Sequence, residues 1–242
     1  MSVDPAYGAR YRELFERHWW WRAREAVILH ELRRLRPDGR WGSILDVGCG
    51  DGLFLPTLAR FGVPEGVEAD ADLVSRRTRE RFTVHLRPFG PDFVPAHPYR
   101  LVLFLDVIEH LDDPVAALAH AASLLEPDGC ILVTVPAFPA LWTRHDVINH
   151  HRRRYTRTLL AAQAAEAGLR LQRARYFFHW VAAAKLLVRA LERVRGGSED
   201  PLPAVPPAPV NRALTALSLV EHRLLGPLRL PFGSSLLGVL TA

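Results

Sequence analysis

Two kinds of hydrophobic pattern alternate along this chain. Short, wholly apolar runs, such as residues 101–105 and 130–135, are typical of strands buried on both faces of a sheet. Between these runs, apolar residues recur at every third or fourth position, which predicts helices with one buried face. Strands and helices that alternate in this way indicate an α/β fold with a mostly parallel sheet.

The pattern predicts seven strands and seven helices. The strands are expected at residues 43–47, within 62–70, at 82–86, at the start of 101–110, and at 130–135, 169–177 and 235–240. The helices are expected at residues 7–35, 53–61, 71–81, 115–125, 157–167, 178–194 and 211–225. Residues 196–209 contain several prolines and glycines and are expected to form a linker.

The predicted helix 7–35 contains three consecutive tryptophans, Trp19, Trp20 and Trp21. Neighbours on a helix point about 100° apart, so the three side chains cannot all face one core. Two roles stay open: packing of an N-terminal helix on the sheet, or a lid over a bound cofactor or substrate. We expect Trp20 and Trp21 to bind substrate.

The first strand runs directly into a glycine-rich loop. Gly48, Gly50 and Gly52 stand at alternate positions between this strand and the helix that follows. Glycine lets the chain turn tightly and lets a ligand approach the backbone, as at a nucleotide site. Asp46 and Asp51 add negative charge, which repels a pyrophosphate and suits a ligand with a cationic amino group. A purely structural glycine turn is the alternative.

This loop resembles the first motif of the class I S-adenosylmethionine-dependent methyltransferases, an Asp-x-Gly-x-Gly-x-Gly turn. The resemblance implies a Rossmann-like sheet of seven strands, helices on both of its faces, and S-adenosyl-L-methionine as cofactor. Glu68 lies about 20 residues beyond the loop, the separation expected of a carboxylate that binds both ribose hydroxyls. The cofactor-binding residues that follow from the resemblance are Asp46, Gly48, Cys49, Gly50, Asp51, Gly52, Glu68, Ala69, Asp106, Val107 and His110.

The densest polar cluster of the chain, residues 137–155, follows the fifth predicted strand. It resembles a His-Asp…His-x-Arg-Arg-Tyr signature found at this place in a branch of the same superfamily. His145 and His150 could take a proton from an acceptor near neutral pH, and arginines could hold an anionic part of the substrate. The expected catalytic residues are His145, His150 and Tyr155, and the expected substrate-binding residues are Trp20, Trp21, Asn149, Arg153, Arg154 and Tyr176.

Three alternative roles for this cluster stay open. Its residues could form a hydrogen-bonded buckle that closes the loop on the sheet. His145, Asp146 and His150 could bind a metal ion, and the arginines could bind nucleic acid. We expect no metal, and we expect no nucleic-acid partner because the chain has no wider basic face.

Composition narrows the class of protein further. The chain has 242 residues, 49% of them hydrophobic, which is ample for one substantial core. Its net charge is +5, with arginines spread along the whole length rather than gathered in a block. Two isolated cysteines and the lack of an apolar signal-peptide core indicate a reducing cytoplasm. No uncharged run is long enough for an integral membrane segment.

We expect a single methyltransferase domain over residues 1–242. Its parts are an N-terminal helical cap at 1–40, the cofactor-binding core at 43–177, a helical insertion or lid at 178–230, and the last strand at 231–242. The insertion could cover the substrate, form a dimer contact or lie on a membrane surface as a peripheral contact. Both a monomer and a homodimer are compatible with this organisation.

The function implied by the resemblance is transfer of a methyl group from S-adenosylmethionine to an oxygen or nitrogen nucleophile of a small molecule. The sulfonium already makes the methyl electrophilic, so the protein mainly aligns an in-line attack. Two alternatives stay open. The nucleophile could attack the aminocarboxypropyl group and release methylthioadenosine, or the chain could be a cofactor-binding partner protein without catalysis.

Overall fold

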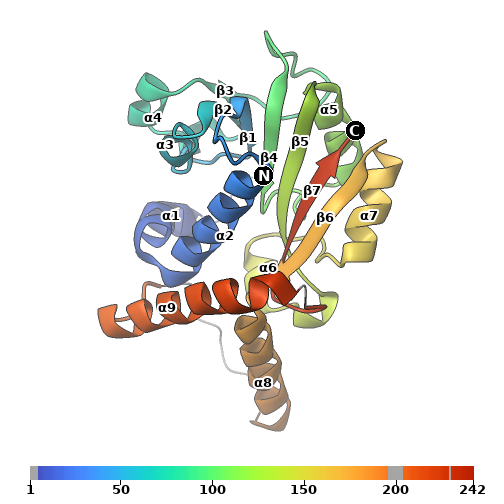
Figure 1. Cartoon of the computed structure of the whole chain (residues 1–242). Helices are drawn as coiled ribbons and strands as arrows, with labels where there is room; N and C mark the ends of the chain where they lie inside the picture. The colour runs from blue at the N-terminus through green and yellow to red at the C-terminus, as the bar shows by residue number, and fades with distance from the viewer. Residues whose placement is uncertain (1–4, 196–203, 229) are drawn as a thin grey trace.

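One seven-stranded sheet organises the computed structural model, which describes residues 5–195, 204–228 and 230–242 (Figure 1). Its strands follow the order β3-β2-β1-β4-β5-β7-β6. Strand β7 is antiparallel to both neighbours, and the other pairs are parallel. The strands are β1 Gly42–Val47, β2 Gly62–Glu68, β3 Val84–Leu86, β4 Tyr99–Leu105, β5 Leu125–Pro136, β6 Arg170–Phe177 and β7 Ser235–Thr241. The predicted fold class is therefore confirmed.

Helices cover both faces of the sheet because successive residues of a strand point to opposite sides. On one face, Val102 and Phe104 of β4 pack in a core with α5 and α7. On the other face, Leu101 and Leu103 pack with α2 and α3. The helices are α1 Pro5–Arg17, α2 Trp19–Leu35, α3 Leu55–Leu58, α4 Arg76–Arg81, α5 Pro114–Ser123, α6 Arg144–Ile148, α7 Arg157–Glu166, α8 His179–Arg195 and α9 Ala208–Leu225.

The prediction of a single N-terminal helix at residues 7–35 is wrong, because the structure has two helices there, α1 and α2, which are separated at His18. His18 has an extended backbone, and its ring nitrogen accepts the Trp20 N–H at 3.2 Å. Asn211 of α9 stabilises the break: its amide oxygen accepts the Trp19 N–H at 2.8 Å, and its amide nitrogen donates to the Arg17 carbonyl at 2.7 Å. The contact comes from a residue remote in the sequence.

Other predicted elements also differ from the structure. Strand β5 begins at Leu125 rather than at residue 130, because Leu125 pairs with Tyr99 across a register shift that lets the strand continue. The helix expected at 53–61 contracts to the single turn of α3. The polar loop 137–155 contains a helix of its own, α6, which begins after a capping box formed by Thr143 and Asp146.

The predicted insertion is two helices, α8 and α9, at the lower edge of the sheet in Figure 1. Strand β7 points away from this edge. Because β5 runs antiparallel to β7, the carboxyl end of β5 and those of the strands parallel to it lie at this edge. The Glu221 carboxylate of α9 accepts the first two amide protons of α8, from His179 at 3.0 Å and Trp180 at 2.6 Å. The two helices are therefore held to each other at their crossing.

Residues 196–203 of the predicted linker lie outside the described residues, and α9 begins three residues earlier than expected, at Ala208. Within the parts of the chain that the structure describes, no helix combines the length and the apolar character needed to cross a membrane.

Candidate functional site

Strained backbone gathers at the edge where the parallel strands end. Four described residues other than glycine have a positive φ: Asp106, Phe138, His150 and Phe178, with values from 54° to 59°. Asp106 directly follows β4, Phe138 and His150 lie in the loop after β5, and Phe178 directly follows β6. Such conformations cost about 1–3 kcal/mol each and cluster at functional sites. Ligands of α/β sheets bind at this same edge, so the two observations place the candidate site here.

The three glycines of the loop after β1 have two different roles. All three have a positive φ, between 55° and 70°. A Cβ at Gly48 would lie 2.8 Å from a methyl carbon of Val107, and one at Gly52 would lie 2.6 Å from a methyl carbon of Thr78. A Cβ at Gly50 would meet no atom within 4 Å. Gly48 and Gly52 therefore allow close packing, whereas Gly50 borders open space that a ligand can approach.

Glu68, at the end of β2, joins this loop to the next one. One carboxylate oxygen accepts the Gly50 N–H at 2.9 Å, and the other accepts the Asp70 N–H at 3.0 Å. The side chain is thereby fixed beside the open face of Gly50, and Ala69 next to it is exposed. Burial, followed by the nearby Asp46, raises the pKa of the Cys49 thiol, and its sulfur packs closely on Gly66 of β2.

The two aspartates of the loop differ in their partners. Asp51 accepts hydrogen bonds from the Ser75 N–H at 2.8 Å and the Thr78 hydroxyl at 3.1 Å, and it forms an ion pair with Arg12. Burial raises its pKa, but these partners more than offset that effect, so the pKa lies below its ordinary value. These contacts tie Asp51 to the start of α4 and to α1, and its role toward a ligand's amino group stays a prediction.

Asp46 has no such partners. No side-chain hydrogen bond reaches its carboxyl from the described residues, although only 4% of the residue is exposed. Burial raises the pKa of Asp46 to about 7, with Arg24 opposing the shift and Glu68 adding to it. Asp46 therefore keeps a buried carboxyl without a hydrogen-bond partner among the described residues, and its role toward a cationic group stays a prediction.

Arg24 of α2 is a site residue that the sequence pattern did not reveal. It is buried, and its guanidinium pairs with Asp106 at 2.6 Å and donates to the Thr134 hydroxyl at 3.1 Å. The same guanidinium lies 5.5 Å from the ring centre of Trp20 and 5.6 Å from that of Trp21. The sequence signal for this contact was the spacing of Trp20 and Arg24, which lie one helical turn apart on the same face of α2.

Trp20 and Trp21 are both partly exposed and packed in an aromatic cluster. Trp20 contacts Trp21 edge-on at 4.9 Å between ring centres and lies 5.9 Å from Phe178. Trp21 also contacts Tyr11 and Phe15 of α1. These contacts favour packing of the N-terminal helices, and a role of the two tryptophans in substrate binding stays a prediction.

The loop after β5 is closed by a buried carboxylate. Asp146 is fully buried and accepts two hydrogen bonds from Arg154, at 2.8 and 2.9 Å, one from the Thr143 N–H at 2.7 Å and one from the His151 ring at 2.8 Å. Arg154 donates a further bond to the Ala137 carbonyl. The loop therefore forms the hydrogen-bonded buckle, and Arg154 is enclosed in it. These contacts favour a structural role for Arg154, and its expected role in substrate binding stays a prediction.

Tyr155, expected to be catalytic, is also enclosed. It is fully buried, its hydroxyl donates to the Ile108 carbonyl at 3.3 Å, and burial raises its pKa well above the ordinary value. It packs the loop after β5 against Ile108 in the loop after β4, and a catalytic role of Tyr155 stays a prediction. Tyr176 likewise accepts the Arg157 N–H and stacks on Phe138 at 4.7 Å.

The remaining predicted residues of this loop lie nearer the surface. The Asn149 amide donates to the His145 carbonyl at 2.8 Å, and Arg153 donates to the Asp112 carbonyl at 3.3 Å. Burial, followed by Lys185, lowers the pKa of His145 to about 4, which makes it a weak base. His150 is exposed and has a φ of 54°.

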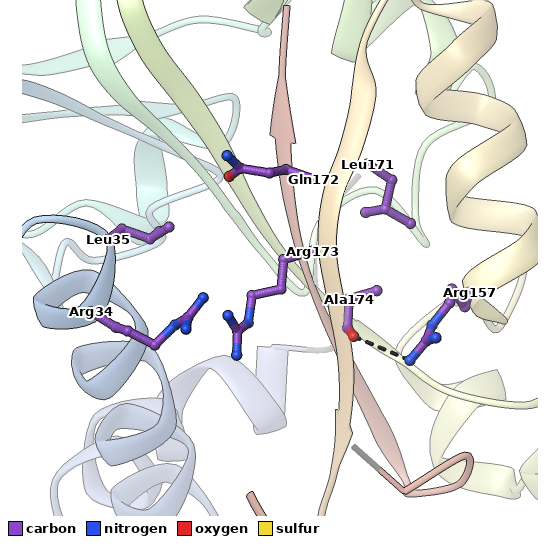
Figure 2. Close-up of a pocket in the computed structure, with 7 residues that line it drawn as sticks. All are labelled: Arg34, Leu35, Arg157, Leu171, Gln172, Arg173 and Ala174. Carbon is purple, nitrogen blue, oxygen red and sulfur yellow. Dashed lines mark hydrogen bonds between the residues drawn. The ribbon is translucent and has the colours of Figure 1, made fainter. Parts of the chain in front are cut away.

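A separate cavity of about 510 Å³ lies beside the edge strand β6, against the end of α2 (Figure 2). Figure 2 shows Arg34 and Arg173 pointing toward each other across it, while Arg157 donates to the Ala174 carbonyl at 3.2 Å. The cavity contains none of the predicted site residues. We therefore assign the candidate site to the carboxyl ends of the strands and not to this cavity.

Comparison with known proteins identifies the family and the fold. A family model described as a methyltransferase domain matches residues 20–174, which include the glycine loop, Glu68 and the buckle. The chain belongs to this methyltransferase family. It is an S-adenosylmethionine-dependent methyltransferase, as the sequence predicted.

Relatives and solved structures agree with this identification. The methyltransferase is 29% identical over 192 residues to a ubiquinone biosynthesis O-methyltransferase of Thiobacillus denitrificans, covering 70% of this chain and 73% of the relative. It is 31% identical over 146 residues to that of Saccharophagus degradans, covering 54% and 61%. A S-adenosylmethionine-dependent methyltransferase from Archaeoglobus fulgidus shares the fold with a TM-score of 0.53 at 18% identity, covering 90% of this chain and 94% of that one. A TehB-like S-adenosylmethionine-dependent methyltransferase from Corynebacterium glutamicum gives 0.56 at 17%, covering 98% and 99%.

The residues present in the methyltransferase fit S-adenosylmethionine. The site holds the carboxyl groups of Asp46, Glu68 and Asp106 against one buried guanidinium, that of Arg24. This excess of carboxyl groups disfavours the binding of a diphosphate and favours a cationic ligand. The open face of Gly50 and the unpartnered Asp46 supply the space and the counter-charge that a sulfonium nucleoside with an amino group requires.

Proposed function

We propose that this methyltransferase transfers a methyl group to a hydroxyl oxygen of a small molecule. The observation that carries the proposal is its similarity to ubiquinone biosynthesis O-methyltransferases over 192 residues, a span that is longer than the cofactor-binding motifs alone. Bound S-adenosylmethionine supplies the electrophilic methyl group. The chain's own residues must hold the cofactor, align the acceptor and take up the acceptor's proton.

Within the proposal, Glu68 accepts hydrogen bonds from the ribose hydroxyls. Its oxygens already accept one amide proton each, and a carboxylate oxygen has a second lone pair to offer. Asp46 binds the amino group. The backbone of Gly48 and Gly50 borders the cofactor, and Ala69, Val107 and His110 flank it at the ends of β2 and β4.

The affinity for S-adenosylmethionine is expected to rise between about pH 5.5 and 7.5. Burial raises the pKa of Asp46 to about 7, and only the ionised carboxylate attracts the ammonium group, most of which stays protonated up to about pH 7.5. Arg24 and Glu68 face Asp46 with opposite charges, and the Cys49 thiol stays neutral. Calorimetry at several pH values measures the effect, roughly 15-fold over the range.

The matched control is Asp46→Asn, which keeps the size of the side chain and removes its titration. Its affinity should be low and independent of pH. An equally steep profile in this variant would assign the pH dependence to another group, and a flat profile in the wild type would remove Asp46 from the amino-group site.

The proton acceptor is proposed to be His150. It lies exposed in the loop after β5, whereas the lowered pKa of His145 makes that imidazole a poor base. His150→Ala is expected to lower kcat by about 10²-fold and leave the cofactor affinity unchanged. His97→Ala, on an exposed histidine far along the chain, is the control. A His150→Ala variant with unchanged kcat would rule out this assignment.

One screen tests the proposed function as a whole. The methyltransferase is incubated with methyl-labelled cofactor and a panel of phenols, catechols, alcohols and amines, and the by-product is identified by mass spectrometry. Label on a hydroxyl acceptor together with S-adenosylhomocysteine supports the proposal. Label only on amines contradicts it, as does release of methylthioadenosine, which indicates attack on the aminocarboxypropyl group.

The proposal also covers the setting of the reaction. We propose that residues 1–242 act as a single domain in the cytoplasm, as a monomer or homodimer, on a small-molecule acceptor and without nucleic acid. Helices α8 and α9 lie at the edge of the sheet that carries the site, which supports a role of residues 178–230 in covering the acceptor. The partly exposed Trp20 and Trp21 of α2, and Arg153 and Asn149 of the loop after β5, are proposed to contact it.

A further inference from the structure

A second cluster lies where the loop after β4 meets the loop after β5, and it shares His110 with the residues proposed to flank the cofactor. Glu109, His110 and His151 each offer one ligand atom, and these atoms all lie within 4.8 Å of one another. The rings of His110 and His151 meet edge-on at 4.8 Å between centres. Neither Glu109 nor His151 has a part in the proposed methyl transfer, so the cluster needs its own explanation.

Glu109 is the most unusual member. It is fully buried, and neither of its carboxylate oxygens has a hydrogen-bond partner. A buried carboxylate without a partner costs several kcal/mol, and native proteins rarely leave one in that state. The buried Asp146 nearby shows the usual solution, since both of its oxygens accept hydrogen bonds. An ion bound between Glu109 and the two imidazoles would supply the missing partner.

His151 is held in the orientation of a metal ligand. Its Nδ1 donates to Asp146 at 2.8 Å, which leaves Nε2 for another partner. Asp146 is in turn fixed by two hydrogen bonds from Arg154. A carboxylate that hydrogen-bonds the second ring nitrogen of a ligating histidine is the common arrangement around protein-bound metals, and it sets the tautomer.

The two loops are also tied to each other by main-chain contacts. The Arg152 N–H donates to the Glu109 carbonyl at 2.9 Å, and the Arg152 side chain donates to the His110 carbonyl at 3.0 Å. The three side chains therefore stand on a rigid junction. This pre-organisation lowers the ordering cost of binding an ion.

We propose that Glu109, His110 and His151 bind a divalent metal ion of the zinc class at this junction. Two imidazole nitrogens and one carboxylate oxygen favour Zn²⁺ over Mg²⁺, which prefers oxygen ligands alone. Ligand atoms of a tetrahedral zinc site lie about 3.4 Å apart, so small side-chain rotations bring the three atoms into place. Three protein ligands leave one position open to water or another oxygen ligand.

The other metal site that the loop sequence permitted, from His145, Asp146 and His150, is not formed. Asp146 has no free lone pair directed at an ion, because His151, Arg154 and Thr143 use both of its oxygens. His150 is exposed. The structure assembles a different set because Glu109 and His110 come from the loop after β4.

Another cluster of two histidines and a glutamate shows an arrangement that does not call for a metal ion. His85 and His97 also flank a glutamate, Glu65, but this carboxylate accepts hydrogen bonds from both rings and from the Tyr99 hydroxyl. It is therefore satisfied without an ion. His97→Ala is the matched control, because it removes a histidine beside a glutamate at a place where no metal is proposed.

The test is metal binding by the full chain in the absence of cofactor and acceptor. After treatment with a chelator, the chain is titrated with Zn²⁺ in a calorimeter and with Co²⁺ by visible absorption. We expect one equivalent of each ion to bind, with the intense absorption of four-coordinate Co²⁺. His151→Ala and Glu109→Gln should each weaken Zn²⁺ binding at least tenfold, and His97→Ala should not change it.

Folding is checked separately by circular dichroism and by calorimetric titration with S-adenosylmethionine. Because Glu109→Gln keeps the shape of the side chain and removes a buried charge, it provides a folded variant even where His151→Ala is unstable. Failure of wild-type protein to bind either ion saturably overturns the proposal. So does binding that survives Glu109→Gln or that is lost in His97→Ala. None of these outcomes depends on whether the acceptor is a hydroxyl.

Discussion

Glu68→Ala is expected to weaken S-adenosylmethionine binding by about 100-fold. The carboxylate holds the loop by accepting the Gly50 and Asp70 amide protons, and it is the proposed partner of the ribose hydroxyls. Hydrogen bonds to a charged group contribute about 1.5–3 kcal/mol, and 100-fold corresponds to about 2.7 kcal/mol. A 100-fold loss of affinity therefore corresponds to the loss of one or two such hydrogen bonds. Isothermal titration calorimetry measures it directly.

The control for this prediction is Glu80→Ala. Glu80 is an exposed glutamate of α4 whose ion pair with Arg76 lies at the surface, so its loss should leave cofactor binding unchanged. Glu68→Gln adds a second comparison, since it keeps the side-chain length but replaces one acceptor oxygen with a donor. Unchanged cofactor affinity in Glu68→Ala would exclude Glu68 from the cofactor site.

Asp146→Ala is expected to lower the free energy of unfolding by about 3–5 kcal/mol. The substitution leaves the buried Arg154 guanidinium without its counter-charge, and breaking a buried ion pair from one side has a cost of this size. It also removes the Thr143 capping box of α6 and the partner of His151. Urea denaturation followed by circular dichroism measures the change.

Asp112→Ala is the matched control on the neighbouring loop. Asp112 also pairs with an arginine, Arg152, but 74% of its side chain is exposed, so the expected loss is about 1 kcal/mol or less. Both variants are measured with a chelator present, which separates the ion pair from any bound metal. Equal losses in the two variants would mean that the buckle contributes little to stability.

Local patterns were enough to predict the sheet and the cofactor loop. Wholly apolar runs such as that of β4 have few alternatives to a buried strand, because their side chains must leave water on both faces. The glycine loop was equally clear, since a positive φ at Gly48, Gly50 and Gly52 is a local property that excludes most other residues. Glu68 followed from its distance along the chain, which the length of one strand and one helix sets.

Tertiary contacts decided the rest, because they join residues that no local pattern connects. Asn211 of α9 divides the N-terminal helix, although it stands 192 residues from its partner Trp19. Arg24 reaches Asp106 only once α2 packs on the sheet, and Glu109 meets His151 only once two loops close on each other. Periodicity shows which side of an element is buried, but the charge and hydrogen-bond partners found there depend on what the fold brings against it.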